Sequence, residues 1–253
     1  MRKVFVIGIG AGNPDYVTIQ AVNVLNEVDV FFIPDKGTEK AALRKLRTEI
    51  CERFIKEKTY RFVDVKPPKR AKDFSDYKSN VEAWHREIEE SYEGLLMEEL
   101  GDGECGAFLV WGDPTLYDST LRIIERIHSK ADFALEYDVI PGISAVQALA
   151  ARHRIALNRI GEPVQITTGR KLAEGFPNNI DSVVVLLDGN QAFKRLDQGD
   201  LEIYWGAYIG TEEEVLIAGK LSEVMDDIER IRAQRRRQNG WIMDTYLLRK
   251  PDK

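Results

Sequence analysis

Three glycine-rich turns are the parts of this sequence best suited to bind a ligand. Gly8-Ile9-Gly10-Ala11-Gly12 ends an apolar run that begins at Val4, and Gly112-Asp113-Pro114 ends a second apolar run. A third turn, Pro141-Gly142-Ile143-Ser144-Ala145, follows another strand-like segment. Glycine permits positive φ angles and lets a ligand approach the main chain closely. We therefore expect backbone amides and carbonyls, more than side chains, to form the binding site.

The first turn is close to the dinucleotide-binding fingerprint but does not match it. That fingerprint reads G-x-G-x-x-G, and its third glycine packs the helix on the strand. Here Asn13 and Pro14 follow the glycines, and Asp29, near the distance of a ribose-binding acid, starts a strand. An NAD(P)-binding oxidoreductase is therefore an alternative. Asp113 and Ser144 also have a purely structural explanation, because both residue types cap helices.

Around the turns, strand-like apolar runs alternate with helical stretches, which is typical of an α/β protein. The strands expected in the first half are 4–9, 28–33, 60–65 and 107–111, and the helices are 18–27, 41–51 and 81–100. The strands expected in the second half are 137–140, 164–168, 183–187, 202–209, 214–220 and 241–249, with helices at 119–129, 144–151 and 221–238. We expect two α/β domains, residues 1–117 and 118–253, each a mixed sheet flanked by helices.

Composition restricts the class of protein. The chain has 253 residues, of which 43% are hydrophobic and 31% charged, as in ordinary soluble globular proteins. No apolar run approaches the ~20 residues of a membrane span, and the first residues lack the pattern of a signal peptide. The net charge of −6 argues against broad nucleic-acid binding. Cys51 and Cys105 indicate two reduced thiols, and hence a cytoplasmic protein.

In this order and spacing, the turns resemble those of the tetrapyrrole methyltransferases of cobalamin and sirohaem biosynthesis. The resemblance covers almost the whole chain and includes five longer stretches: Phe31 to Gly37, Phe108 to Thr120, Ala150 to Ile155, Ile203 to Tyr208 and Trp241 to Tyr246. It implies a homodimer of two-domain chains that bind S-adenosylmethionine between the domains. The longer stretches imply methylation of a precorrin at ring carbon C-1, with loss of acetate.

The resemblance also implies which residues contact S-adenosylmethionine. They lie in the turns and at later strand ends: Gly10, Ala11, Trp111, Gly112, Asp113, Leu116, Ser144, Ala145, Asp188, Gly210 and Ala218. Many relatives carry methionine at the position of Asp188. Two roles therefore stay open for its carboxylate, contact with the amino group of the cofactor or contact with the substrate.

Release of acetate requires water to attack an acyl carbon, which needs a general base and an oxyanion stabiliser. The candidate catalytic residues are Tyr117, Asp118 and His153, although Tyr117 also fits a core aromatic. An acidic protein must gather cations for a polycarboxylate tetrapyrrole, and arginine suits carboxylates. The candidate substrate-binding residues are Arg152, Arg154, Arg159 and Arg170. No residues have the spacing of metal ligands, so we expect no metal.

Three alternatives remain open at this point. A sibling methyltransferase would act on another precorrin carbon or on a diphthine-type protein side chain. An NAD(P)-binding oxidoreductase and a non-catalytic corrinoid carrier belong to other classes. Ligand binding separates these two classes from a methyltransferase, because only a methyltransferase should be stabilised by S-adenosylhomocysteine and not by NAD(H).

Overall fold

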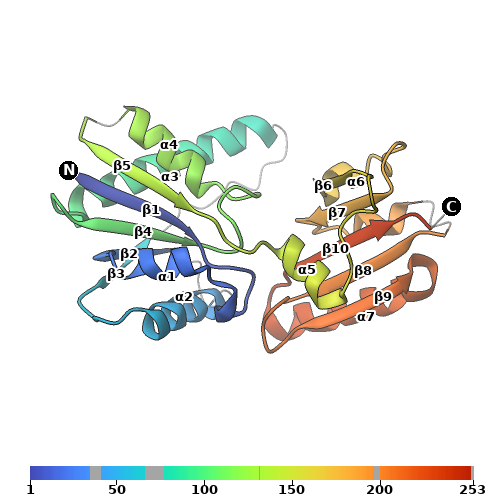
Figure 1. Cartoon of the computed structure of the whole chain (residues 1–253). Coiled ribbons are helices and arrows are strands. Elements are labelled where there is room, and N and C mark those ends of the chain that lie inside the picture. Colours follow the sequence, from blue (N-terminus) through green and yellow to red (C-terminus); the bar gives the residue numbers. More distant parts are fainter. Residues whose placement is uncertain (35–40, 66–76, 131, 197–199, 252–253) are drawn as a thin grey trace. The chain divides into compact units, whose positions relative to one another are not determined.

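Figure 1 shows the chain as a computed structural model that describes residues 1–34, 41–65, 77–130, 132–196 and 200–251. Residues 35–37, the end of one motif stretch, lie outside these ranges. The chain divides into two compact units, Met1–Gly10 with Pro14–Ile143, and Ala11–Asn13 with Ser144–Lys253. This division falls later than the predicted boundary after Tyr117. The reason is that the helix and strand that follow Tyr117 complete the first sheet.

The first unit contains a five-stranded sheet. Its strands, in spatial order, are β3 (Arg61–Val65), β2 (Val30–Pro34), β4 (Cys105–Val110), β1 (Arg2–Gly8) and β5 (Leu135–Ile140). Every pairing between these strands is parallel, whereas we expected a mixed sheet. The carboxyl ends of the strands therefore lie at one edge of the sheet. Ligands of open parallel sheets bind at that edge.

Helices cover both faces of this sheet (Figure 1). They are α1 (Ile19–Leu25) and α2 (Ala41–Phe54) on one face, and α3 (Tyr77–Glu99) and α4 (Thr120–Lys130) on the other. Val4 and Val6 of β1 belong to one buried core, whereas Phe5 and Ile7 belong to the core on the opposite face. Burial on both faces explains why these strands are unbroken apolar runs in the sequence.

The second unit contains a mixed sheet. Its strands, in spatial order, are β6 (Val164–Thr168), β7 (Ser182–Leu186), β10 (Asp244–Arg249), β8 (Glu202–Ala207) and β9 (Val215–Lys220). Only β6 and β7 pair in parallel. The helices of this unit are α5 (Ala145–His153), α6 (Gly169–Leu172) and α7 (Leu221–Asn239). The predicted fold class, two α/β sheets flanked by helices, is confirmed.

Short helices account for most of the differences between prediction and structure. The 3-10 helices η1 (Pro14–Tyr16) and η3 (Ala192–Arg195), as well as α6, have no counterpart among the predicted elements. A helix of three or four residues is too short to show an apolar period in the sequence. Among the described residues, no helix is long and apolar enough to cross a membrane.

Candidate functional site

In the first unit, three neighbouring strand ends meet through their backbones alone. Gly10 and Gly112 form an isolated bridge, in which the Gly112 N–H donates to the Gly10 carbonyl at 2.9 Å. A Cβ atom on Gly142 would lie 2.1 Å from the Gly112 carbonyl oxygen, and one on Gly8 would lie 2.6 Å from the Gly142 nitrogen. No side chain fits at these positions. The three glycine turns therefore converge at one edge of the sheet, and we call this meeting point of Gly8, Gly10, Gly112 and Gly142 the glycine junction.

Asp113 holds the glycine junction together with its carboxylate. One oxygen accepts the Gly142 N–H at 2.9 Å, and the other accepts the Thr115 N–H at 2.8 Å and the Thr115 hydroxyl. Burial opposes the charged form, but these hydrogen bonds together lower the pKa of Asp113. The helix-capping role considered for Asp113 is wrong, because Asp118 is the residue whose carboxylate accepts the N–H of Thr120 at the start of α4.

The residues beside the glycine junction differ in exposure. Trp111 packs partly against the core around Ile7, and its indole N–H makes no hydrogen bond within the described part of the chain. Leu116 donates its N–H to the Asp113 carbonyl at 3.2 Å. Tyr117 has a φ of 54° and is 46% exposed, so it is not the core aromatic considered above. Strained backbone of this kind clusters at functional sites.

Asp118 lines a small pocket at the carboxyl ends of β2 and β4, about 70 Å³ in volume. Arg47 of α2 and Tyr92 of α3 line the same pocket. Arg47 is only 8% exposed, and its Nε donates to the Leu109 carbonyl at 2.9 Å. The sequence analysis does not single out Arg47 or Tyr92. One signal for Arg47 exists, since it occupies a position next to Leu46 in the apolar stripe of its helix.

In the second unit, Ser144 begins α5. Its Oγ accepts the Val146 N–H at 3.1 Å, and the Gln147 side chain accepts the Ser144 N–H at 3.1 Å, which together form a capping box. The structural explanation of Ser144 as a helix cap is therefore confirmed. Ala145 is the first residue of α5, while Ala218 lies exposed in β9.

The remainder of the first turn belongs to this second unit. Ala11 is buried, and Gly12 has a φ of 102°. A Cβ atom on Gly12 would lie 2.4 Å from the Ile209 carbonyl oxygen. The neighbouring Gly210 has a φ of 81°, and its N–H donates to the Glu214 carboxylate at 2.8 Å. Both glycines are thus required by the backbone, as the sequence predicts for ligand-binding turns.

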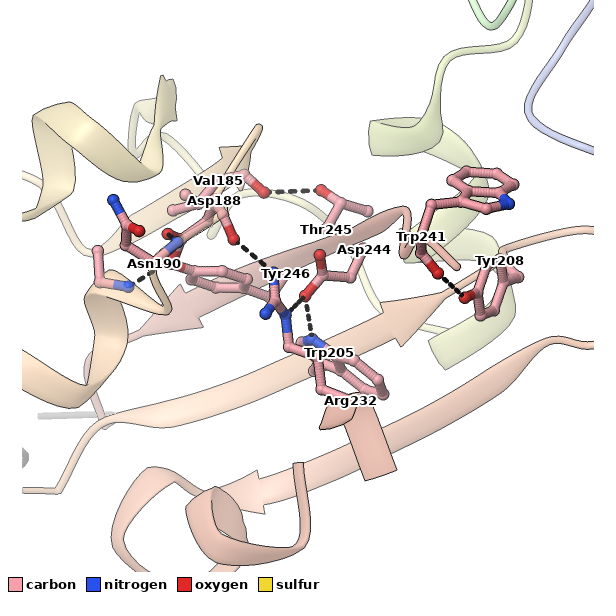
Figure 2. Close-up of polar contacts among 11 residues, drawn as sticks. Val185, Asp188, Asn190, Trp205, Tyr208, Arg232, Trp241, Asp244, Thr245 and Tyr246 are labelled. Carbon is pink, nitrogen blue, oxygen red and sulfur yellow. Dashed lines mark hydrogen bonds and ion pairs between the residues drawn. The ribbon is translucent and has the colours of Figure 1, made fainter. Parts of the chain in front are cut away.

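Asp188, which follows β7, is fully engaged by the protein (Figure 2). One oxygen accepts the Asn190 N–H at 3.1 Å, and the other accepts the Ala192 N–H and the Tyr246 hydroxyl, both at 2.6 Å. The residue is 5% exposed, and a Cβ atom on Gly169 would lie 2.3 Å from its Oδ1. The carboxylate of Asp188 therefore holds the chain after β7 in place. The contact between Asp188 and a ligand stays a prediction.

A buried ion pair supports the same strand end (Figure 2). Arg232 of α7 donates from Nε to Asp244 at 2.9 Å and from Nη2 to the Asp188 carbonyl at 2.8 Å. The indole N–H of Trp205 donates to the same Asp244 oxygen at 3.0 Å. Burial raises the pKa of Asp244, while Arg232 acts in the opposite direction. This pair is not evident from the sequence, because α7 is so rich in charge that Arg232 resembles a surface residue.

His153 packs α5 against β8. Its Nε2 lies 3.0 Å from the Trp205 carbonyl oxygen, and its ring meets Tyr204 edge-on with 5.6 Å between centroids. Burial lowers its pKa, although the Trp205 carbonyl and Glu214 act in the opposite direction. A neutral ring that donates from Nε2 fits this environment. The geometry is explained by packing, and the predicted catalytic role stays a prediction.

Comparison with known proteins decides the family. Residues 3–225 match the profile of the tetrapyrrole (corrin/porphyrin) methylases. The chain belongs to the tetrapyrrole (corrin/porphyrin) methylase family. It is 52% identical over 250 residues to the precorrin-6A synthase (deacetylating) of Sinorhizobium sp, and the match covers 99% of this chain and 96% of that protein.

Solved structures agree with this family. A cobalamin synthesis related protein (CobF) from Corynebacterium diphtheriae matches with a TM-score of 0.84 and 39% identity, over 100% of both chains. A uroporphyrin-III C-methyltransferase from Thermus thermophilus, in complex with S-adenosylhomocysteine, has a TM-score of 0.56 at 15% identity. That match covers 98% of this chain and 97% of the other, and it shows that the two share a fold.

The four arginines predicted to bind substrate occupy different places in the second unit of this methylase. Arg152 pairs with Glu214, with 2.6 Å between Nη2 and Oε1. Arg154 and Arg170 are exposed. Arg159 donates to the carbonyl of Lys250, directly after the last residue of β10. Arg170 comes after the last residue of β6, and that end of β6 lies at the opposite edge of the sheet. The structure therefore separates Arg159 from Arg170.

The cysteines of this methylase are both free thiols. Burial raises the pKa of Cys51 to about 12, so the thiol is protonated and unreactive at neutral pH. Burial also raises the pKa of Cys105. Over the described ranges, no group of three or more His, Cys, Asp or Glu side chains is arranged to hold a metal ion.

Proposed function

We propose that this methylase is a precorrin-6A synthase of the deacetylating type. It would convert precorrin-5 to precorrin-6A in cobalamin biosynthesis, by methylating ring carbon C-1 and releasing the two-carbon fragment as acetate. The observation that carries the proposal is the 52% identity to the precorrin-6A synthase (deacetylating) of Sinorhizobium sp over nearly the full length of both chains. The TM-score of 0.84 with CobF supports the same assignment.

The glycine junction fits a methyl donor held mainly by the main chain. Gly8 and Gly142 leave no room for a Cβ atom, and Gly112 has a φ of 72°, so we expect a ligand to meet the backbone itself. The unpartnered indole N–H of Trp111 adds a donor beside it. S-adenosylmethionine, when bound, supplies a methyl group made electrophilic by its sulfonium sulfur. The protein then has to hold and orient the reacting atoms, which is the main way such a site accelerates transfer.

We divide the proposed donor contacts between the two units. In the first unit they are Gly10, Trp111, Gly112, Asp113 and Leu116, and in the second they are Ala11, Ser144, Ala145, Asp188, Gly210 and Ala218. Asp113 acts as a positioning residue, because its carboxylate joins two of the turns.

The catalytic and substrate contacts are proposals of the same kind. Tyr117 and Asp118 directly follow the turn that carries Gly112, and the strained backbone of Tyr117 supports their place in the site. The proposed contacts with carboxylates of the substrate are those of Arg152, Arg154, Arg159 and Arg170. We also propose a cytoplasmic homodimer, which light scattering of the purified chain would test.

Product analysis with the full chain tests the proposed function. The chain is incubated with precorrin-5 and methyl-labelled S-adenosylmethionine, and the tetrapyrrole and acetate are measured by mass spectrometry. The expected product gains one labelled methyl group and loses its acetyl group. Methyl gain without acetate would indicate a sibling methyltransferase.

Ligand binding checks the class of enzyme without any substrate. S-adenosylhomocysteine should raise the melting temperature by mass action, and NAD(H) should not. Stabilisation by NAD(H) alone would favour an oxidoreductase instead. Gly112→Val is the matched variant, because a side chain at the glycine junction should abolish the effect of S-adenosylhomocysteine.

A further inference from the structure

The pocket at the carboxyl ends of β2 and β4 lies entirely within the first unit, and its walls are about equally polar and apolar. Those walls include Phe32, Trp84, Ile88 and Phe108. Its volume of about 70 Å³ is well below the roughly 300–1,000 Å³ of sites that enclose a cofactor or a drug-sized molecule. A tetrapyrrole or S-adenosylmethionine is therefore too large for it. A fragment of two carbons, together with a water molecule, is of the right size.

The polar residues that line this pocket include Arg47, Tyr92 and Asp118, beside Ser119 and Thr120. Arg47 donates from Nε to the Leu109 carbonyl and from Nη1 to the Leu43 carbonyl at 3.1 Å, which fixes its guanidinium. Its Nη2 makes no hydrogen bond to any residue that the structure describes. The Tyr92 side chain is 7% exposed, and within the same ranges its hydroxyl has no partner either. Both donors are therefore available to water or to a ligand that enters the pocket.

The three groups are close enough to influence one another. Burial lowers the pKa of Arg47, and the negative charge of Asp118 opposes that effect. Burial raises the pKa of Tyr92, with a further increase from Asp118 and an opposing effect of Arg47. Tyr92 therefore keeps its proton and can donate it in a hydrogen bond. The pocket combines two donors, one carboxylate and an apolar wall.

We propose that this pocket is where the acyl fragment of the precorrin is hydrolysed, an inference that rests on the proposed function. The apolar wall takes the methyl end of the fragment, and Arg47 and Tyr92 donate to its carbonyl oxygen. Asp118 is the general base for the attacking water. The order of the chain supports this placement, since Asp118 follows the turn of the glycine junction by only a few residues.

The proposed step balances with water as the only added reactant. The water oxygen forms a bond to the acyl carbon while one water proton passes to Asp118. Negative charge develops on the carbonyl oxygen, where Arg47 and Tyr92 stabilise it. The bond between the acyl carbon and the ring carbon then breaks, and its electron pair stays on the ring carbon, which becomes the nucleophile for methylation. The fragment leaves as acetic acid, which releases a second proton on ionising to acetate.

Binding of acetate alone tests the pocket without any tetrapyrrole. The full chain is titrated with ¹³C-labelled acetate, followed by NMR line broadening. Parent protein should show saturable binding, and Arg47→Gln should weaken it by at least about tenfold, since it removes a charged donor. If Arg47→Gln fails to fold, Tyr92→Phe, which removes only the hydroxyl oxygen, takes its place as the test variant in the acetate titration. Arg44→Gln is the matched control, because Arg44 lies on the same helix with its side chain 43% exposed, and it should bind as the parent does. Equal affinity in Arg47→Gln, Tyr92→Phe and Arg44→Gln would overturn the proposal.

A turnover assay is the second test of the proposed hydrolytic pocket. With precorrin-5 in H₂¹⁸O, Asp118→Asn should slow the release of ¹⁸O-labelled acetate by about 10²- to 10⁴-fold. Its affinity for S-adenosylhomocysteine should stay at the parental value. If the parent releases acetate and Asp118→Asn does so equally fast, the pocket is not the hydrolytic site, while the proposed function stands. If the parent does not turn over precorrin-5, the proposed function fails, and the acetate titration still decides whether the pocket binds the fragment.

Discussion

Replacing Arg232 by methionine should strongly destabilise the second unit. Arg232 is 5% exposed and donates to both Asp244 and the Asp188 carbonyl. Removing one partner of a buried ion pair typically costs about 3–5 kcal/mol, because the other charge stays buried without compensation. Methionine fills most of the space of the arginine stem, so lost packing should contribute little. We therefore expect a loss of about 3–5 kcal/mol in the free energy of unfolding at pH 8.

The loss should depend on pH in a defined direction. Burial already raises the pKa of Asp244, and Arg232 is the largest influence that opposes this increase. Without Arg232 the pKa of Asp244 rises further above its unfolded value. A carboxyl group with a raised folded pKa destabilises the protein above its unfolded pKa, and the cost disappears as the pH falls to that unfolded value. The difference between parent and Arg232→Met should therefore shrink as the pH falls from 8 to 5.

Urea unfolding followed by circular dichroism measures this loss at both pH values. The double variant Arg232→Met/Asp244→Asn should recover part of it, since the lone buried charge is gone. Arg230→Met is the matched control on the same helix. Arg230 pairs with Asp227 on the surface, with both side chains more than 60% exposed, so its loss should cost less than about 1 kcal/mol. If Arg232→Met costs no more than Arg230→Met, the buried pair does not stabilise the unit as argued.

Three further predictions concern the residues near the site. Gly142→Ala should weaken S-adenosylhomocysteine binding in calorimetry, because its Cβ would lie 2.1 Å from the Gly112 carbonyl oxygen; parental affinity would show that the junction tolerates a side chain. Asp113→Asn should lower the melting temperature at pH 7, and the difference from the parent should vanish as the pH falls below ~4. The reason is that a lowered folded pKa stabilises the protein fully above the unfolded pKa, and this stabilisation is lost as the pH falls through the folded pKa. His153→Phe should lower the free energy of unfolding by about 1 kcal/mol, because the hydrogen bond to Trp205 is lost, and should leave kcat unchanged. A large fall in kcat at parental stability would instead make His153 catalytic.

The sequence predicts the long elements of the fold well, because their signals are local. Unbroken apolar runs such as 107–111 correspond to strands buried on both faces, here β4. The division between the units is harder to predict. It depends on β5 pairing with β1, and that contact joins segments far apart in the sequence. Sheet direction is equally non-local, which is why the parallel first sheet differs from the mixed sheet expected.

The glycine junction can be predicted from sequence because glycine is required by the backbone itself. At Gly142 and Gly8 the space for a Cβ atom is taken by neighbouring main chain. The role of Asp188 is not predictable in this way. A carboxylate at a strand end is equally suited to a ligand and to backbone amides, and only the positions of Ala192 and Tyr246 reveal that the protein uses it.

One feature of the sequence, the position of an arginine on the apolar face of a helix, identifies both buried arginines. Arg47 precedes Ile50 by three positions, and Arg232 follows Ile228 by four, so each occupies the apolar stripe of its helix. A charged residue on such a stripe must find partners in the interior. Arg232 finds its carboxylate in Asp244 and is explained by the fold.

The same rule leads to a different result for Arg47. Two of its nitrogens are held by carbonyl groups, and the residue lines a pocket together with Tyr92 and Asp118. Removing the charged guanidinium of Arg47 from water costs stability, because the residue is only 8% exposed. A protein that folded only for stability would gain by replacing it with an apolar residue. That cost is explained if the donor is needed for a carbonyl oxygen that enters the pocket during the reaction, and it is the physical reason to expect chemistry there.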